Sequence, residues 1–219
     1  MDPARIAKLL EPFQAPLSTA QLNNISIYID ILLRWNARTN LTAVRDPEEI
    51  VARHFGESLF AARNLFPADN GRRSLASPER SAGTDDCIDV GSGAGFPGLP
   101  IKLWAPDIRL TLIESNHKKA TFLREVARAL TLTDVNVFPG RAEDFPTQAR
   151  VVTLRAVERF DAILPTAIRL LAPGGRLALL IGEAQVARAR QLAPGLSWSV
   201  PLPIPLSSSR MLAVASRGI

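Results

Sequence analysis

The stretch that decides the fold is Asp89-Val90-Gly91-Ser92-Gly93-Ala94-Gly95-Phe96-Pro97-Gly98. Its first two residues end a short β-rich run at residues 87–90, and its last residue opens a helical pattern at 98–104. Glycines let the backbone turn sharply and let a ligand approach with no Cβ in the way. The loop therefore predicts a ligand site at the carboxyl end of a strand, where open α/β sheets bind their ligands.

On the C-terminal side of this loop, β-rich runs alternate with helical patterns. The runs lie at 87–90, 109–113, 135–138, 151–154 and 176–181, and the helical patterns at 98–104, 116–130 and 158–171. This alternation predicts an α/β domain with a mostly parallel sheet covered on both faces. After a helical pattern at 183–192, two further runs at 197–200 and 211–215 are expected to pair as an antiparallel hairpin at the sheet edge.

On its N-terminal side the chain is first helical and then polar. Apolar residues recur at helical spacing up to residue 13 and again from 22 to 33, and further helices are expected from Asp46 and over 56–65. Residues 67–85 are rich in Pro, Asp, Gly, Ser and Arg, which predicts a mobile surface linker. We therefore expect a helical subdomain at 1–66, a linker at 67–85 and the α/β domain at 86–219.

The composition excludes several classes of protein. With 219 residues and 47% apolar residues, the chain can bury a sizeable core. The single cysteine, Cys87, excludes a disulfide framework within the chain and is expected to be inert core packing. Two histidines make a metal site unexpected, and the charged first residues and the lack of a long apolar run predict a cytoplasmic protein.

The basic charge is unevenly distributed along the chain. The net charge is +5, and 22 of the 26 basic residues are arginine, the better partner for phosphate. Residues 1–60 hold six basic and seven acidic residues, whereas the rest holds 20 and 14. Either the excess reflects a general composition bias, or a nucleic acid binds mainly to the later part of the chain.

Two nucleotide ligands fit the glycine loop. Residues 93–98 match the dinucleotide pattern G-x-G-x-x-G, with Glu114 about 20 residues further on. The S-adenosylmethionine pattern, acid-x-G-x-G-x-G, is matched by Asp89, Gly91, Gly93 and Gly95. The second is favoured because Asp89 can hold the loop and a ligand ammonium group, and because no residues remain for a second dehydrogenase domain.

Later strand ends bring further candidates to the same edge of the sheet. Glu114 ends the second strand and can accept hydrogen bonds from both ribose hydroxyls, unless it is only a surface acid at a helix start. Ala142 and Glu143 follow the third strand, in a position that suits contacts to the adenine edge. Arg155 ends the fourth strand and faces the same crevice, where it could orient a carboxylate or hold a phosphate.

Taken together, these motifs resemble the bacterial rRNA small subunit methyltransferase G family, also called glucose-inhibited division protein B. The resemblance covers roughly residues 20–215 and is carried by residues 35–47, 53–55, 89–98, 112–115, 118–119, 122–123, 141–143 and 154–157. One departure is Ile181, where the family usually has a lysine.

The resemblance implies a Rossmann-like class I S-adenosylmethionine-dependent methyltransferase that modifies N7 of one guanine in the 530-region loop of 16S rRNA. The residues expected in the cofactor pocket are Asp89, Gly91, Gly93, Gly95, Phe96, Glu114, Ala142, Glu143 and Arg155. The candidates for RNA contact are Asn36, Asn40, Arg53, His54, Lys118 and Lys119, although His54 could instead pack between the two parts of the chain.

No obligate general base is expected, because guanine N7 has a free lone pair at neutral pH. The expected partner is 16S rRNA, alone or in the small ribosomal subunit or its precursor, and the enzyme is expected to act as a monomer without a metal. Two alternatives remain at this point: a nicotinamide-dependent oxidoreductase, and a non-catalytic RNA-binding factor in ribosome assembly.

Overall fold

The computed structural model describes residues 1–67, 86–156 and 159–219. Apart from Pro67, the predicted linker lies outside these residues, as does Glu158 near the start of one predicted helix. Within the described parts of the chain, no helix is both long enough and apolar enough to span a bilayer.

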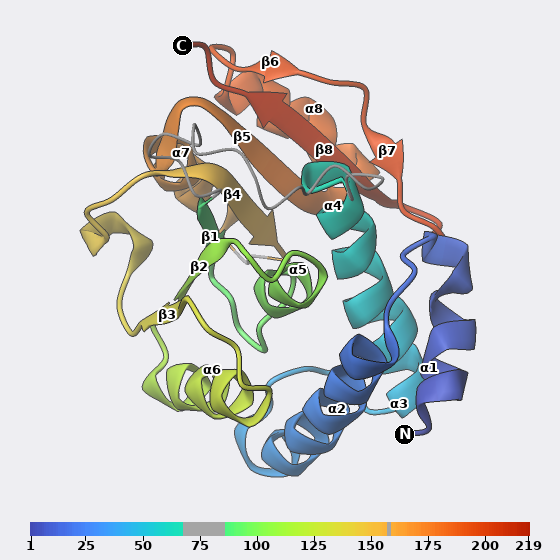
Figure 1. Ribbon diagram of the computed structural model, residues 1–219. Coiled ribbons are helices and arrows are strands. Elements are labelled where there is room, and N and C mark those ends of the chain that lie inside the picture. Colours follow the sequence, from blue (N-terminus) through green and yellow to red (C-terminus); the bar gives the residue numbers. More distant parts are fainter. Residues whose placement is uncertain (68–85, 157–158) are drawn as a thin grey trace, which may run out of the picture.

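The described strands form one sheet in the order β3-β2-β1-β4-β5-β8-β6, with β7 also paired to β8. Figure 1 shows this order from β3 at the lower left to β6 at the top. The strands are β1 (Asp86–Val90), β2 (Arg109–Ile113), β3 (Val135–Phe138), β4 (Ala149–Arg155), β5 (Leu171–Gly182), β6 (Ser197–Trp198), β7 (Leu202–Pro203) and β8 (Arg210–Ser216). The first five are parallel and β8 runs antiparallel to β5, so the predicted α/β sheet is confirmed.

The predicted hairpin forms, but its place in the sheet differs. Trp198 of β6 pairs with Ala215 of β8, as expected. However, β8 lies inside the sheet, because its other side pairs with β5 along seven residues. Its buried residues Leu212, Ala213 and Ala215 suit an inner strand. The short strand β7, which was not predicted, comes from the proline-containing loop and pairs with β8.

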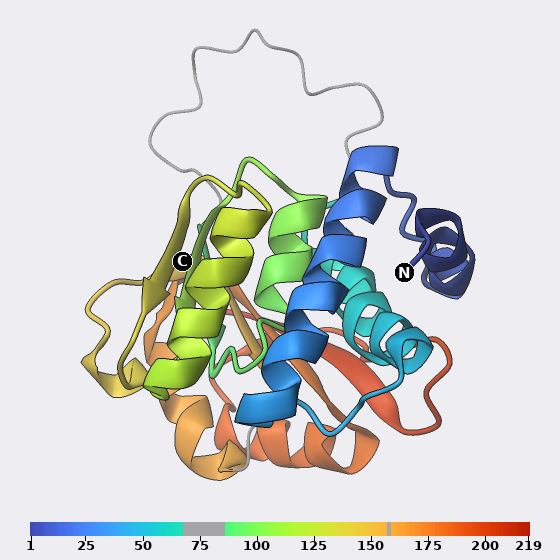
Figure 2. The same ribbon diagram turned by 90° about the horizontal axis from the view of Figure 1, so that it is seen from below.

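Helices cover the two faces of the sheet, as Figure 2 shows. One face carries α7 (Phe160–Arg169) and α8 (Glu183–Leu192), which pack on strand residues such as Val152 and Leu179. The other carries α5 (Gly98–Trp104) and α6 (His117–Ala129) together with the N-terminal helices. Neighbouring residues such as Leu179 and Leu180 thus belong to different apolar clusters, which is the alternation that a doubly covered sheet requires.

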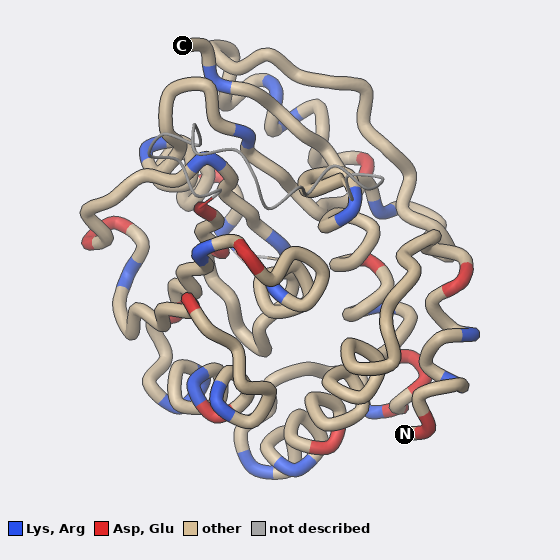
Figure 3. The backbone as a smooth tube through the Cα atoms, in the orientation of Figure 1, with Lys and Arg blue, Asp and Glu red and all other residues tan. Residues whose placement is uncertain are grey.

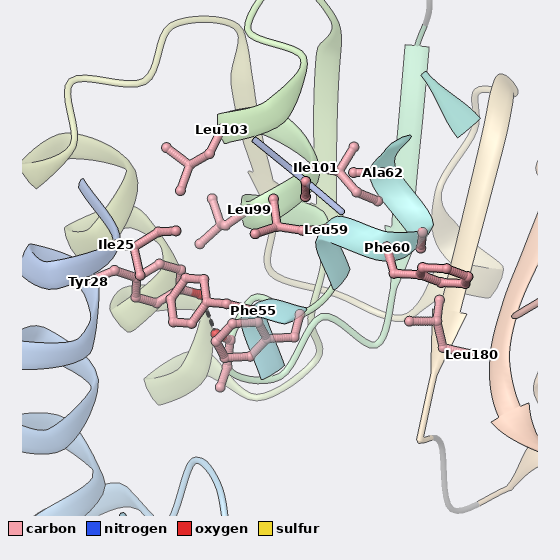
Figure 4. Packing of buried hydrophobic residues seen from close by; sticks show 14 of the residues in the cluster. Ile25, Tyr28, Phe55, Leu59, Phe60, Ala62, Leu99, Ile101, Leu103 and Leu180 are labelled. Atoms are coloured by element: carbon pink, nitrogen blue, oxygen red, sulfur yellow. Dashed lines mark hydrogen bonds between the residues drawn. The ribbon is translucent and has the colours of Figure 1, made fainter. Parts of the chain in front are cut away.

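The N-terminal helices share one core with the sheet. They are α1 (Pro3–Leu10), the 3-10 helix η1 (Glu11–Phe13), α2 (Thr19–Thr39), α3 (Pro47–Glu49), the π-helix η2 (Ile50–Gly56) and α4 (Glu57–Leu65). Figure 4 shows Tyr28 and Phe55 side by side, with their ring centroids 5.2 Å apart. Leu59 lies near Leu99 of α5, and all four side chains are buried in the same cluster.

One run of helix replaces the two separate helices expected over 46–65. α3, η2 and α4 follow one another without a break, and Asp46 caps the run by accepting a hydrogen bond from the Glu49 N–H. Gly56 is needed inside it because a Cβ there would lie 2.3 Å from the ring of Phe13. The π-helical segment, a geometry often found at functional sites, contains His54.

Candidate functional site

A cavity of about 610 Å³ opens at the carboxyl ends of the parallel strands. Its volume is in the range of small-molecule and cofactor sites. Its walls come from the β1–α5 loop, the ends of β2 and β4, the loop after β3, and the N-terminal residues Leu41, Thr42 and His54. A second cavity of about 700 Å³ lies at the amino ends of β1, β2 and β3. The first is the candidate site, because ligands of open α/β sheets bind at the carboxyl ends.

The three glycines of the loop serve different purposes. Gly91, Gly93 and Gly95 all have positive φ angles, of 68°, 55° and 87°. Around Gly93 there is open space, since a Cβ would meet only the Gly91 carbonyl oxygen at 3.8 Å. At Gly95 a Cβ would lie 2.3 Å from the Tyr28 hydroxyl oxygen. Gly91 and Gly93 line the cavity, whereas Gly95 lets the loop pack against α2.

Asp89 supports the loop from beneath. It is 1% exposed, and its carboxylate accepts hydrogen bonds from the Thr153 hydroxyl at 2.8 Å and from the Gly98 N–H at 3.3 Å. Burial raises the pKa of this carboxyl to about 6. Asp89 is not among the residues that line the cavity, so the structure places it in the support of the loop and not at the ammonium group of a ligand.

Glu114 ties the end of β2 to the same loop. One carboxylate oxygen accepts a hydrogen bond from the Gly93 N–H at 2.9 Å, and the other accepts one from the Asn116 N–H at 2.8 Å. Glu114 is 7% exposed and lines the cavity. Because each carboxylate oxygen can accept more than one hydrogen bond, it can still receive two ribose hydroxyls. The alternative of a purely exposed surface acid does not agree with this burial.

Arg155 forms part of the opposite wall with three groups from distant segments. The two N–H groups of its Nη2 are shared among three acceptors: the Glu57 carboxylate at 2.9 Å, the Arg53 carbonyl oxygen at 2.8 Å and Nδ1 of His54 at 3.1 Å. Arg210 shares the same Glu57 oxygen at 2.7 Å. Among the described residues, Arg155 Nε is the one buried side-chain nitrogen or oxygen with no hydrogen-bond partner.

This arrangement fits S-adenosylmethionine. The space beside Gly93, the remaining acceptor capacity of Glu114 and the unpartnered N–H of Arg155 match the adenosyl, ribose and carboxylate groups of such a ligand. Ala142 and Glu143 also line the cavity from η3 (Ala142–Asp144). Of the nine residues predicted for the cofactor pocket, seven therefore lie around one cavity, and Asp89 and Gly95 lie behind it.

The helical side of the cavity is built on Asn36, Thr42 and His54. The Asn36 amide donates to the Thr42 carbonyl oxygen at 2.9 Å and accepts from the Thr42 N–H at 3.0 Å. His54 contacts the Thr42 hydroxyl through Nε2 at 2.8 Å and stacks on Phe96 with ring centroids 4.8 Å apart. Burial, followed by the charge of Arg155, lowers the pKa of His54 to about 3, so its ring is neutral at pH 7.

The six candidates for RNA contact differ in exposure and surroundings. His54 and Lys119 line the cavity, and Lys118 lies exposed at the start of α6. Asn40 is exposed at the end of α2, and Arg53 is exposed and paired with Glu49 at 2.8 Å. Asn36 is 4% exposed with its amide fully engaged by Thr42, so its expected role in RNA contact is replaced by a role in positioning Thr42.

Sequence reasoning missed several residues of the site. Thr42 and Arg210 line the cavity, and Glu57 binds two arginines behind it. Thr42 stands inside a stretch that carried the family resemblance, which was the available signal. Arg210 and Glu57 are 153 residues apart in the chain and belong to no pattern that spacing could reveal.

The cavity is basic. Its lining includes five cationic side chains and two acidic ones, Glu114 and Glu143. The cations are Lys119, Arg141, Arg155, Arg159 and Arg210. All five belong to the later part of the chain, where the sequence has its excess of basic residues.

Comparisons with known proteins agree on one family. A family model described as rRNA small subunit methyltransferase G matches residues 21–199. A protein of Chloroflexus aggregans named ribosomal RNA small subunit methyltransferase G is 37% identical over 215 residues, which cover 92% of this chain and 84% of that protein. A protein of the same name in Xanthomonas euvesicatoria is 37% identical over 198 residues, which cover 87% of this chain and 84% of that protein.

Solved structures show the same fold at lower sequence identity. A SAM dependent methyltransferase from Aquifex aeolicus is similar with a TM-score of 0.52 and 16% identity, over 61% of this chain and 82% of that one. P. horikoshii TYW2 in complex with MeSAdo has a TM-score of 0.52 and 18% identity, over 64% and 60%.

Proposed function

Because this chain belongs to the rRNA small subunit methyltransferase G family, it is an S-adenosylmethionine-dependent methyltransferase of 16S rRNA, and we propose that its target is N7 of a guanine in the 530-region loop. The observation that carries the proposal is the cavity, which joins a cofactor-type loop to a lining with five cationic and two acidic side chains. The sequence resemblance identifies the 530-region loop of the RNA and the N7 atom of its guanine as the target.

The cofactor would be held by the carboxyl-end loops. Gly91 and Gly93 leave room for it, Glu114 would accept its ribose hydroxyls, and Ala142 and Glu143 would contact its adenine. When bound, S-adenosylmethionine supplies a methyl group on a positively charged sulfur. The chain's contribution is to place the guanine in line with that methyl group, and such positioning is a large source of rate acceleration.

The protonation states in the cavity suit an N7 target. Guanine N7 has a free lone pair at neutral pH, so the enzyme has no proton to remove before methylation. The one histidine of the cavity is neutral, and its Nδ1 lone pair already accepts a hydrogen bond from Arg155. His54 is therefore engaged in structure and is not available as a general base, which agrees with a reaction that needs none.

The RNA would lie over the basic side of the molecule. Basic residues occur on α6 and at the carboxyl end of α2, which lie side by side at the bottom of Figure 3. Trp35 of α2 donates a hydrogen bond to Glu125 of α6 at 3.0 Å and so holds the two helices together. Lys118, Lys119 and Arg38 on these helices are suited to phosphate contacts. The base must enter unpaired, because proteins reach RNA bases mainly in loops.

Transfer of labelled methyl groups tests the proposal. We expect the protein to label assembled small subunits or naked 16S rRNA, with the label mapped to 7-methylguanosine in the 530-region loop. Glu114→Ala is the matched control, since it should lose cofactor affinity in calorimetry and transfer in parallel. Label on another atom or in another loop would overturn the proposed target, and binding to rRNA without any transfer would favour a non-catalytic assembly factor.

A further inference from the structure

Six residues form one continuous series of hydrogen bonds along the helical side of the cavity; Asn36 joins it through the backbone of Thr42, and the other links run between side chains. In order, they are Arg210, Glu57, Arg155, His54, Thr42 and Asn36. They come from β8, α4, β4, η2, the loop after α2, and α2 itself. No step of cofactor binding uses the Thr42 end of this series.

Arg155 determines which atoms donate and which accept in the hydrogen bonds of His54 and Thr42. A guanidinium group can only donate, so Nδ1 of His54 accepts the hydrogen bond from Arg155 at 3.1 Å. The neutral ring then carries its proton on Nε2. Consequently, Nε2 donates to the Thr42 hydroxyl oxygen at 2.8 Å.

The Thr42 hydroxyl is left with one function. Its oxygen also accepts a hydrogen bond from the Val44 N–H at 3.1 Å, so both lone pairs are occupied. Its own O–H remains a donor with no acceptor among the residues that the structure describes. The Asn36 amide binds both the N–H and the carbonyl oxygen of Thr42 and so fixes its backbone. Thr42 itself lines the cavity. These hydrogen bonds thus hold the Thr42 hydroxyl rigidly as a donor that cannot act as an acceptor.

We propose that the Thr42 hydroxyl donates a hydrogen bond to O6 of the target guanine and thereby selects guanine over adenine. The inference rests on the proposed function, because a base that is methylated at N7 must turn its N7 edge toward the cofactor. On that edge guanine offers the acceptors N7 and O6, whereas adenine offers N7 and an amino donor. A hydroxyl whose lone pairs are both occupied can pair with O6 but not with the adenine amino group.

The test combines a change in the enzyme with a change in the RNA. The enzyme variants are Thr42→Val, which removes the hydroxyl, and Thr42→Ser, which keeps it. The RNA carries either guanine or 2-aminopurine at the target position, the latter having N7 but no O6. Thr42→Val is expected to lower kcat/KM on guanine about 10- to 100-fold, the range for a buried acceptor left without its donor, and Thr42→Ser should stay within about threefold of wild type.

The decisive result is that the rate losses caused by Thr42→Val and by 2-aminopurine do not multiply when the two changes are combined. The 2-aminopurine substrate should slow the wild-type enzyme about as much as Thr42→Val does, and it should slow the Thr42→Val enzyme little further. Cofactor affinity, measured by calorimetry, should be the same in both variants. If the two losses multiply, or if wild type methylates 2-aminopurine at full rate, the role of Thr42 is overturned. The second of these results needs no variant, and failure of the wild type to methylate guanine N7 would instead overturn the proposed function.

Discussion

The two walls of the cavity are held in place in different ways. The loop wall, residues 89–98, is fixed mainly through its own backbone N–H groups, which bind the end of β2: those of Gly91 and Ser92 donate to the Ile113 carbonyl oxygen, and that of Gly93 donates to the Glu114 carboxylate. The helical wall, residues 36–57, is fixed by side chains from distant segments, with Arg155 101 residues from His54. The difference teaches that the loop is held mainly through its backbone by the neighbouring strand, whereas the helical wall depends on side chains that several elements of the fold bring together.

The walls meet at a cluster of aromatic rings. The Tyr28 hydroxyl donates a hydrogen bond to the Ala94 carbonyl oxygen of the loop wall. Phe96 of the loop lies parallel to Tyr28 at 5.4 Å and stacks on His54 of the helical wall. Rearrangement of either wall therefore changes the surface against which the other packs, and this contact couples the cofactor side to the substrate side.

The helical wall should be broken most severely by Glu57→Gln. The Glu57 side chain is 4% exposed and neutralises both Arg155 and Arg210. Its loss would leave buried positive charge without a partner, which typically costs about 3–5 kcal/mol. We expect the free energy of unfolding, measured with urea, to fall by that amount.

Asp161→Asn is the control for this change. Asp161 also pairs with an arginine, Arg188, at 2.7 Å, but both side chains are about half exposed. Exposed ion pairs contribute little, so the change should stay within about 1 kcal/mol. Equal losses in the two variants would show that the buried network does not hold the helical wall.

The loop wall should be distorted by Gly95→Ala, with Gly93→Ala as its matched partner. Both residues have positive φ angles, but only at Gly95 would a Cβ collide, with Tyr28 at 2.3 Å and Leu99 at 2.6 Å. We expect Gly95→Ala to lower the free energy of unfolding by about 2–4 kcal/mol through overpacking and backbone strain together. Gly93→Ala should cost about 1–2 kcal/mol from its backbone alone.

Cofactor calorimetry separates the two roles further. The Cβ of Gly93→Ala would occupy space at the cavity. Relative to its loss in free energy of unfolding, this variant should therefore lose more cofactor affinity than Gly95→Ala. The reverse order would mean that Gly95, and not Gly93, faces the ligand.

The fold could be predicted largely because its signals are local. The runs at 109–113 and 135–138 and the helices at 98–104 and 183–192 have the predicted bounds. The errors concern features that depend on neighbours: β8 became an inner strand because β6 and β7 cover its outer side, and the helices of 46–65 joined because η2 bridges them. Neither the order of strands in a sheet nor a π-helix has a signature in hydrophobic spacing.

The residues of the site likewise divide into those that sequence spacing reveals and those that only the fold brings together. Gly91, Gly93 and Glu114 could be found because a glycine loop after a strand and an acid at the end of the next strand have fixed spacing. Glu57 and Arg210 could not, because a salt bridge across 153 residues leaves no periodic trace. Asn36 was predicted to contact RNA, and only the fold shows that its buried amide is turned to Thr42. Sequence identifies which residues are special more readily than what they contact.

Acidification should act on the two walls in opposite directions. The pKa of His54 is lowered from 6.5 to about 3, so the unfolded state takes up this proton first and stability is lost as pH falls below 6.5. The pKa of Asp89 is raised from 3.8 to about 6, so the folded state takes up that proton first and stability is gained as pH falls through 6. Between pH 7 and 5, the helical wall is weakened while the loop wall is relieved of a buried charge.

Urea unfolding at pH 7 and pH 5 can resolve the two contributions. Compared with wild type, His54→Gln should lose about 2 kcal/mol less stability on acidification, because it no longer carries the group that the unfolded state protonates. Asp89→Asn should lose about 1 kcal/mol more than wild type, because it lacks the compensating gain. If His54→Gln keeps the wild-type pH dependence, the pKa of His54 is the same in the folded and unfolded states, and the folded ring takes up a proton between pH 7 and 5. Burial beside Arg155 would then not hold the ring neutral, and the fixed direction of the hydrogen bonds toward Thr42 would lose its support.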